Sequence, residues 1–102
     1  MARFGESLAA AYLAERNAII VGRNVRAGRG EIDLLVRMDS TLVAVEVKTR
    51  VGTDPRRAYT VEKSDHVWET ARRLTPRPRR VDLVAIELTS GGAGIRWIPG
   101  VR

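Results

Sequence analysis

Apolar and polar residues recur with two different periods along this chain, and the periods predict where helices and strands lie. Between Phe4 and about Asn17, apolar residues recur at helical spacing and form one stripe, which predicts an amphipathic helix. A second helix is predicted from Val61 to Leu74, and it ends before Pro76, which cannot continue a helix. Runs rich in Val, Ile and Leu predict five strands, at 18–21, 31–38, 41–50, 81–88 and 95–98.

The order of these elements, α-β-β-β-α-β-β, predicts an α/β fold in which helices flank a mixed β-sheet. We expect an arginine-rich turn from Arg23 to Gly30 and a flexible glycine-rich turn from Ser90 to Gly94. Strands 41–50 and 81–88 are expected to be parallel, because a helix crosses between them. No linker or internal repeat divides the 102 residues, so we expect a single domain over residues 1–102.

Charged residues interrupt the most apolar part of the chain, the predicted hairpin of strands 31–38 and 41–50. Asp33 lies in its first strand, and Glu46 and Lys48 lie in its second. Side chains alternate along a strand, so Glu46, Lys48 and Arg50 share one face and the valines between them share the other. If the strands pair around the turn at residues 39–40, the face that bears Asp33 comes near the face that bears Glu46.

Two converging carboxylates with a lysine beside them suit Mg²⁺ or Mn²⁺, hard cations that take oxygen ligands from protein, water and phosphate. Such an ion lowers the pKa of a bound water and offsets charge on a phosphodiester, and Lys48 would orient that water or stabilise the developing charge. The alternative is a salt-bridged polar sheet edge, in which Lys48 neutralises Glu46 or Asp33. Residue spacing alone leaves both interpretations open.

Composition narrows the class of partner. Eighteen Lys and Arg against 12 Asp and Glu give a net charge of +6, and all but two of the cations are Arg. Arginine binds phosphate in a bidentate manner, so the balance favours a nucleic-acid partner, although solubility and a codon bias toward Arg also produce it. The absence of Cys excludes disulfides and thiolate metal sites. Without a signal peptide or a membrane-spanning run, we expect a cytoplasmic protein that does not enter a membrane.

Several short motifs resemble those of a known family. The D…ExK pattern of Asp33 and Glu46-Val47-Lys48, with twelve residues between its two parts, resembles the signature of the restriction-endonuclease-like, or PD-(D/E)xK, superfamily. Added to it are Gly5-Glu6, Arg23-Asn24, Gly30-Glu31-Ile32-Asp33-Leu34 and Val45-Glu46-Val47-Lys48-Thr49-Arg50. Together they resemble the YraN-like family of small bacterial proteins, which is similar to archaeal Holliday-junction resolvases.

The resemblance implies a role for each matching residue. Asp33 and Glu46 would be metal ligands, with the backbone carbonyl of Val47 as a third, and Lys48 would be the catalytic lysine. Glu6 would assist the site from the first helix. The implied function is a Mg²⁺-dependent DNA endonuclease that acts on branched or damaged DNA as a homodimer, without an organic cofactor. The alternative is a non-catalytic nucleic-acid-binding subunit of a DNA-processing complex that retains the nuclease fold, or a basic scaffold protein on RNA.

Basic residues outside this site are candidates for phosphate contact, although cations near the end of a helix also complement its dipole. The resemblance adds Lys63 to them, as a basic position at the start of the second helix. The candidates for nucleic-acid binding are Arg23, Arg26, Arg29, Arg50, Lys63, Arg72, Arg73, Arg77, Arg79 and Arg80. The single histidine, His66, is expected on the surface, and Trp68 and Trp97 in the core or at an interface.

Overall fold

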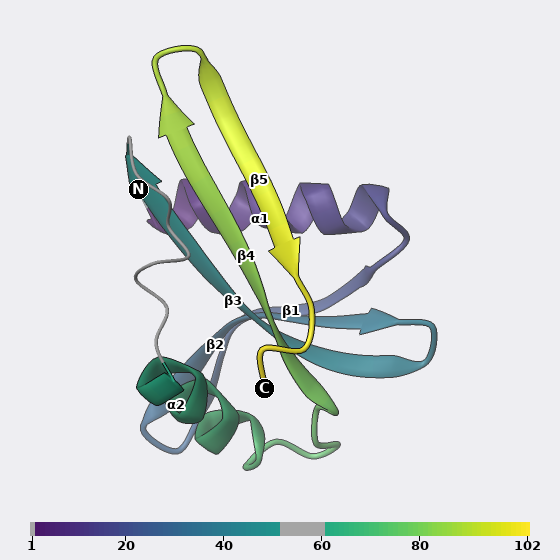
Figure 1. Ribbon diagram of the computed structural model, residues 1–102. Coiled ribbons are helices and arrows are strands. Elements are labelled where there is room, and N and C mark those ends of the chain that lie inside the picture. Colours follow the sequence, from purple (N-terminus) through teal and green to yellow (C-terminus); the bar gives the residue numbers. More distant parts are fainter. Residues whose placement is uncertain (1, 52–60) are drawn as a thin grey trace.

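The computed structural model describes residues 2–51 and 61–102, and within them the side chains of residues 4–51 and 65–102. Two helices and five strands follow the predicted order α-β-β-β-α-β-β (Figure 1). They are α1 (Ala2–Glu15), β1 (Ile19–Ala27), β2 (Gly30–Met38), β3 (Thr41–Val51), α2 (Val61–Ala71), β4 (Arg80–Thr89) and β5 (Gly92–Ile98). The predicted α/β class is therefore confirmed.

Two predicted turns are much shorter than expected. Arg23 and Arg26 lie within β1, where they pair with β2, and only Gly28 and Arg29 form the turn. Gly28 has a φ of 60°, a left-handed conformation that glycine adopts at little cost, and this permits the tight reversal. Likewise β5 begins at Gly92 rather than at Ile95. Asn and Gly are typical of turns and therefore predict a turn in each segment. The structure instead places Asn24 in β1 and Gly92 and Gly94 in β5, within strands that pair with their neighbours.

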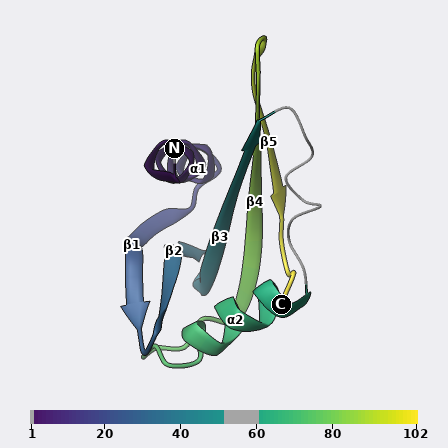
Figure 2. The same cartoon turned by 90° about the vertical axis from the view of Figure 1, so that its left-hand side faces the viewer.

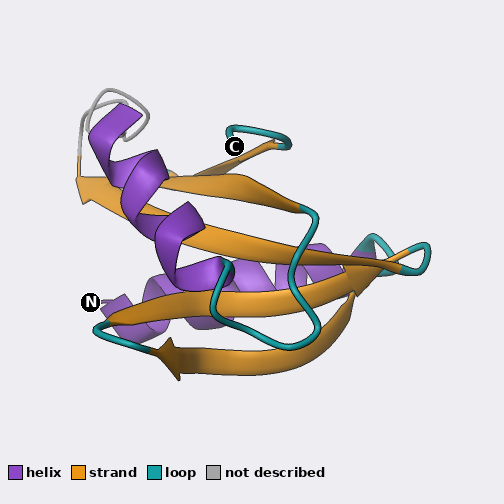
Figure 3. Cartoon of the chain, turned by 90° about the horizontal axis from the view of Figure 1, so that it is seen from below, coloured by secondary structure: helices purple, strands orange, loops and turns teal. Residues whose placement is uncertain are grey.

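All five strands form one sheet in the order β1-β2-β3-β4-β5. The β3–β4 pair is parallel, as predicted from the intervening helix, and the other three pairs are antiparallel. The two helices cover opposite faces of the sheet (Figures 2 and 3). Ala9 and Leu13 of α1 pack on Val43 and Val45, whereas α2 packs on Ala44 of the same strand. This alternation along β3 is the one that the sequence predicts.

No helix in the described parts of the chain has the length and apolar character needed to cross a membrane.

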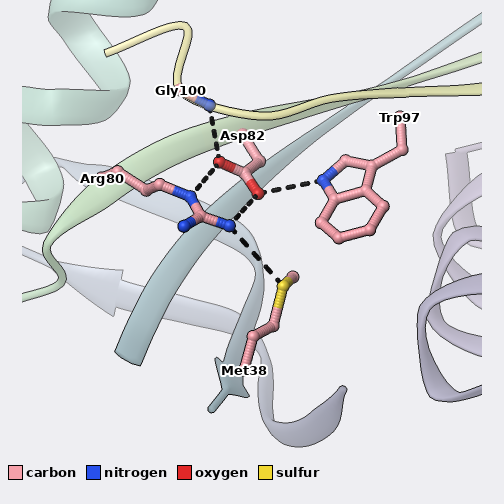
Figure 4. A network of polar contacts seen from close by, with 5 residues as sticks. All are labelled: Met38, Arg80, Asp82, Trp97 and Gly100. Atoms are coloured by element: carbon pink, nitrogen blue, oxygen red, sulfur yellow. Dashed lines mark hydrogen bonds and ion pairs between the residues drawn. The ribbon is translucent and has the colours of Figure 1, made fainter. Parts of the chain in front are cut away.

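A fully buried carboxylate, that of Asp82, joins β4 to β5 and to the last residues of the chain (Figure 4). Its Oδ1 accepts hydrogen bonds from Arg80 Nε and from the Gly100 N–H, at 2.8 and 2.9 Å. Its Oδ2 accepts them from Trp97 Nε1 and from the second arm of the Arg80 guanidinium, at 2.9 and 3.2 Å. Arg80 also contacts the sulfur of Met38. Residue patterns do not predict this network, although a single Asp in the apolar run from Val81 to Ile86 is a visible signal of a buried polar contact.

Candidate metal centre

The candidate site lies where β2 and β3 separate. Their antiparallel pairing begins beside the turn, at Met38 and Thr41, and its last pair in register is Leu34 with Val45. Beyond that pair the Asp33 carboxylate takes the place of a backbone acceptor: its Oδ2 accepts a hydrogen bond from the Val47 N–H at 2.8 Å. Because Asp33 satisfies this donor, β3 can leave β2 without an unpaired buried amide. The Asp33 carboxylate is thereby fixed beside β3.

The charged end of β3 is held from its other side by β4. The parallel pairing aligns Glu46 with Leu83 and Lys48 with Ala85 and continues to Val51. Lys48 Nζ lies 3.5 Å from Glu46 Oε1, and the exposed fractions of the two side chains are 26% and 15%. A partly buried ion pair is thus presented on a rigid strand, beside the carboxylate of Asp33.

Close packing of α1 on β3 brings Glu6 to the same place. Gly5 is buried, and a Cβ atom there would collide with the Thr49 hydroxyl. Only glycine therefore allows the helix to approach the strand this closely. Residues from α1, β2 and β3 then surround one hollow of about 410 Å³, and they are Glu6, Asp33, Glu46, Val47, Lys48, Thr49 and Arg50. The structure thus brings together all four residues predicted to be catalytic, together with Val47.

Carboxylates in this hollow are short of compensating positive charge. Burial raises the pKa of Glu46 from its ordinary 4.5 to about 7, and the charge of Asp33 adds to the effect while Lys48 opposes it. Burial also raises the pKa of Asp33, against the opposing effects of the Val47 N–H and Lys48. The pKa of Glu6 is raised by burial and then by Asp33. Lys48 opposes the shifts of Asp33 and Glu46, and Arg23 opposes that of Glu6, yet the pKa values of all three acids remain raised.

The donor set fits a hard divalent cation. Asp33 and Glu46 line the same hollow, and the charge of Asp33 raises the pKa of Glu46, so one ion between them would relieve this repulsion. Among the described residues, no three Asp, Glu or His side chains are arranged to enclose an ion. A metal here would therefore rest on two carboxylates and a backbone oxygen, with water and a phosphate group completing its coordination. Mg²⁺ is commonly held in this way.

Comparison with known proteins places the chain in a family. The model of "Uncharacterised protein family UPF0102" matches residues 5–86. The chain belongs to the UPF0102 family. A UPF0102 protein of Solibacter usitatus is 39% identical over 109 residues, covering 96% of this chain and 82% of that protein. One from Streptomyces coelicolor is 38% identical over 106 residues (93% and 82%), and one from Syntrophotalea carbinolica is 33% identical over 109 residues (98% and 89%). UPF0102 is the YraN-like family that the sequence motifs resemble.

The site of this UPF0102 chain continues beneath α2. Glu46 and Lys48 also border a second hollow of about 270 Å³, whose other lining residues are Gly30, Glu31, His66, Val67 and Thr70. Gly30 matters here because a Cβ atom would collide with the Thr70 hydroxyl and push α2 away from β2. Neither Glu31 nor His66 was among the predicted site residues, although Glu31 shares the predicted strand face of Asp33. His66 is exposed, as expected.

Three of the predicted phosphate-binding cations border the hollows. Arg50 lines the first, and Arg29 and Arg73 line a third hollow of about 340 Å³, which shares Gly30, His66 and Thr70 with the second. The three hollows therefore adjoin one another from the β1–β2 turn to the end of β3.

The remaining predicted cations lie elsewhere. Arg23 contacts the Ser7 hydroxyl at 3.5 Å, Arg26 lies 4.0 Å from Glu31, and Arg72 is paired with Glu69 at 3.2 Å. Arg80 is bound to Asp82, so its guanidinium fork is already engaged. Arg77 and Arg79 are exposed in the segment between α2 and β4. The Lys63 side chain lies outside the part of the chain that the structure describes.

Proposed function

We propose that this protein is a divalent-metal-dependent DNA endonuclease that hydrolyses phosphodiester bonds of branched or damaged DNA in the cytoplasm. The observation that carries the proposal is the convergence of Asp33, Glu46 and Lys48 on one hollow at the point where β2 and β3 separate. The raised pKa values of both carboxyl groups support it, since they reflect a demand for positive charge that Lys48 alone does not meet.

Each residue has a definable task in this proposal. Asp33 and Glu46 would hold Mg²⁺ or Mn²⁺ together with the backbone carbonyl of Val47. The bound ion would supply Lewis-acid charge and an acidified water. Lys48 would donate hydrogen bonds to the attacking oxygen or to the phosphate, and its ion pair with Glu46 keeps its ammonium group directed into the hollow. Glu6 would accept hydrogen bonds from water on the side nearest Asp33.

DNA is the substrate that the charge distribution favours. Carboxylates directed at a polyanion repel it unless a cation lies between them, so an acidic hollow in a protein of net charge +6 is consistent with a metal–phosphate site. Arg50, Arg29 and Arg73 border the hollows and would hold the backbone on either side of the scissile phosphate. The resemblance to Holliday-junction resolvases supports branched DNA as substrate and a homodimer as the active form.

The alternative is a non-catalytic DNA-binding subunit that retains the fold. It is favoured by the Lys48–Glu46 ion pair and the Asp33–Val47 hydrogen bond, because these give each group a partner without any metal. In that case the site residues would stabilise the end of the sheet, and DNA would bind through the arginines alone.

Cleavage of end-labelled linear, flapped and four-way DNA with Mg²⁺ or Mn²⁺ separates the two functions. We expect the wild type to cut at least one substrate, and Asp33→Asn and Lys48→Ala each to reduce the rate by roughly 100-fold or more. Asp39→Asn is the matched control, because Asp39 is exposed in the turn at the opposite end of β2. If the wild type binds DNA without cutting it, or if the two site variants cut like the control, the endonuclease proposal is wrong.

A further inference from the structure

Asn24 adopts an unusual backbone conformation in the middle of β1. Its neighbours Arg23 and Val25 pair with Leu34 and Ile32, so Asn24 lies opposite Asp33 across the β1–β2 ladder. Its φ is 50°, in the left-handed region of backbone conformation. Residues with a Cβ atom rarely adopt this region, and Asn tolerates it better than most of them. A strand residue held in this conformation directs its side chain away from the regular alternation, which calls for a compensating contact.

That contact is a bridge between two acids. One terminal atom of the Asn24 amide lies 2.8 Å from Glu31 Oε1 and 2.9 Å from Glu6 Oε1. It must be the nitrogen, because a carboxylate can only accept a hydrogen bond and the NH₂ group carries two protons to donate. Asn24 thus joins α1, β1 and β2 through one side chain.

The bridge solves a problem that the acidic site creates. Glu6 and Glu31 each add to the negative charge around Asp33, and repulsion alone would drive the Glu6 side chain away from the hollow. A neutral double donor holds both carboxylates without adding a charge that would compete with a metal ion. Arginine or lysine at this position would instead neutralise the acids that the ion needs.

We propose that Asn24 is a positioning residue that holds Glu6 of α1 at the metal site, and this inference rests on the function proposed above. Groups that orient ligands without touching the metal commonly change metal affinity by 10- to 100-fold when they are removed. Asn24 therefore acts through Glu6 and contacts neither the metal nor the DNA.

Asn24→Gly removes the amide and still fits the backbone, since glycine adopts a φ of 50° without strain. Asn17→Gly is the matched control: Asn17 is also left-handed, with a φ of 72°, but it is exposed in the turn between α1 and β1. Mn²⁺ binding to the DNA-free protein, measured by titration calorimetry, is the first readout. We expect Asn24→Gly to weaken Mn²⁺ binding by about tenfold and Asn17→Gly to leave it unchanged.

Combining Asn24→Gly with Glu6→Gln shows whether the effect passes through Glu6. If it does, the double variant binds Mn²⁺ no more weakly than Glu6→Gln alone, whereas independent effects would multiply. In cleavage assays Asn24→Gly should lower kcat with little change in the KM for DNA. Multiplying effects, or wild-type affinity in Asn24→Gly, would overturn the role of Asn24 alone. A wild type that binds no Mn²⁺ would overturn the proposed metal site and this inference with it.

Discussion

Two acidic regions of this sheet differ in how fully their carboxylates are paired. Asp82 is completely buried, and its two oxygens accept four hydrogen bonds from Arg80, Trp97 and Gly100. The carboxylates of Asp33 and Glu46 are only partly buried, and the donors described for them are the Val47 N–H and Lys48. Depth of burial alone would single out Asp82, whereas the proposed metal site contains the less buried Asp33 and Glu46.

The number of donors distinguishes the two regions better than burial does. A buried carboxylate with all its lone pairs occupied adds to the specificity of the fold and has no capacity left for a ligand. The Glu46 carboxylate instead has a raised pKa, first because it is buried and then because Asp33 repels its charge, so a further cation would stabilise its ionised form. The first arrangement is typical of structure and the second of a binding site.

Replacing each aspartate by asparagine should give the largest contrast. In Asp82→Asn an NH₂ group would face donors, and the Arg80 guanidinium would lose its counter-charge, so we expect the free energy of unfolding to fall by about 3–5 kcal/mol. In Asp33→Asn the amide oxygen can still accept from the Val47 N–H and one repelling charge is removed, so stability should change by less than about 1 kcal/mol. Urea unfolding of metal-free protein measures both. Equal losses in the two variants would contradict this difference between Asp82 and Asp33.

Metal addition should sharpen the same contrast. An ion that binds only the folded protein, at 100 times its dissociation constant, raises the free energy of unfolding by about 2.7 kcal/mol. We expect Mg²⁺ or Mn²⁺ to produce such an increment in the wild type. Asp82→Asn should keep it, because the partners described for Asp82 are Arg80, Trp97 and Gly100 and none of them lines the site, and Asp33→Asn should lose most of it. An increment that survives Asp33→Asn would place the ion elsewhere on the protein.

The sequence was sufficient to predict the order of the elements, the parallel β3–β4 pair and the residues that gather at the site. Those features follow from local periodicity and from motifs in which Asp33, Glu46 and Lys48 lie close together in the chain. The long turn predicted at residues 23–30 was wrong because Asn and Gly are ambiguous signals: they mark turns, but they also fit strands at strained positions such as Asn24.

Contacts between distant segments were beyond such reasoning. In the Asp82 network, Trp97 and Gly100 lie 15 and 18 positions along the chain from Asp82. The Asn24 bridge requires the register of β1 against β2 and the placement of α1. Neither register nor helix placement is fixed by residue spacing. The Arg80–Asp82 contact is different, because these residues are two positions apart on one strand: Arg80 is expected to contact phosphate like its neighbours, but Asp82 holds its guanidinium.

Stability of the metal-free protein should depend on pH through Glu46. Its pKa is raised from 4.5 to about 7 in the folded state, so between these values the folded protein binds more protons than the unfolded chain. The protonation of Glu46 contributes to the free energy of unfolding fully below about pH 4.5, and this contribution of about 3 kcal/mol is lost as the pH rises through about 7. Glu46→Gln should flatten that part of the profile. A wild-type profile already flat there, or one that Glu46→Gln leaves unchanged, would show that Glu46 is not the group responsible.

The smallest expected effects separate two arginines that sequence alone placed in one group. Arg80→Lys keeps the charge beside Asp82 but loses the two-armed contact, so we expect a loss of about 1 kcal/mol in unfolding free energy and unchanged DNA affinity. Arg73→Gln removes an exposed cation that borders the hollows, so it should leave the free energy of unfolding nearly unchanged. It should weaken DNA binding about two- to threefold and reduce the salt dependence of binding by about the contribution of one phosphate contact. Fluorescence anisotropy over a series of salt concentrations measures the second effect. If Arg80→Lys weakens DNA binding more than Arg73→Gln does, Arg80 leaves Asp82 to contact DNA, and the Asp82 region is not purely structural.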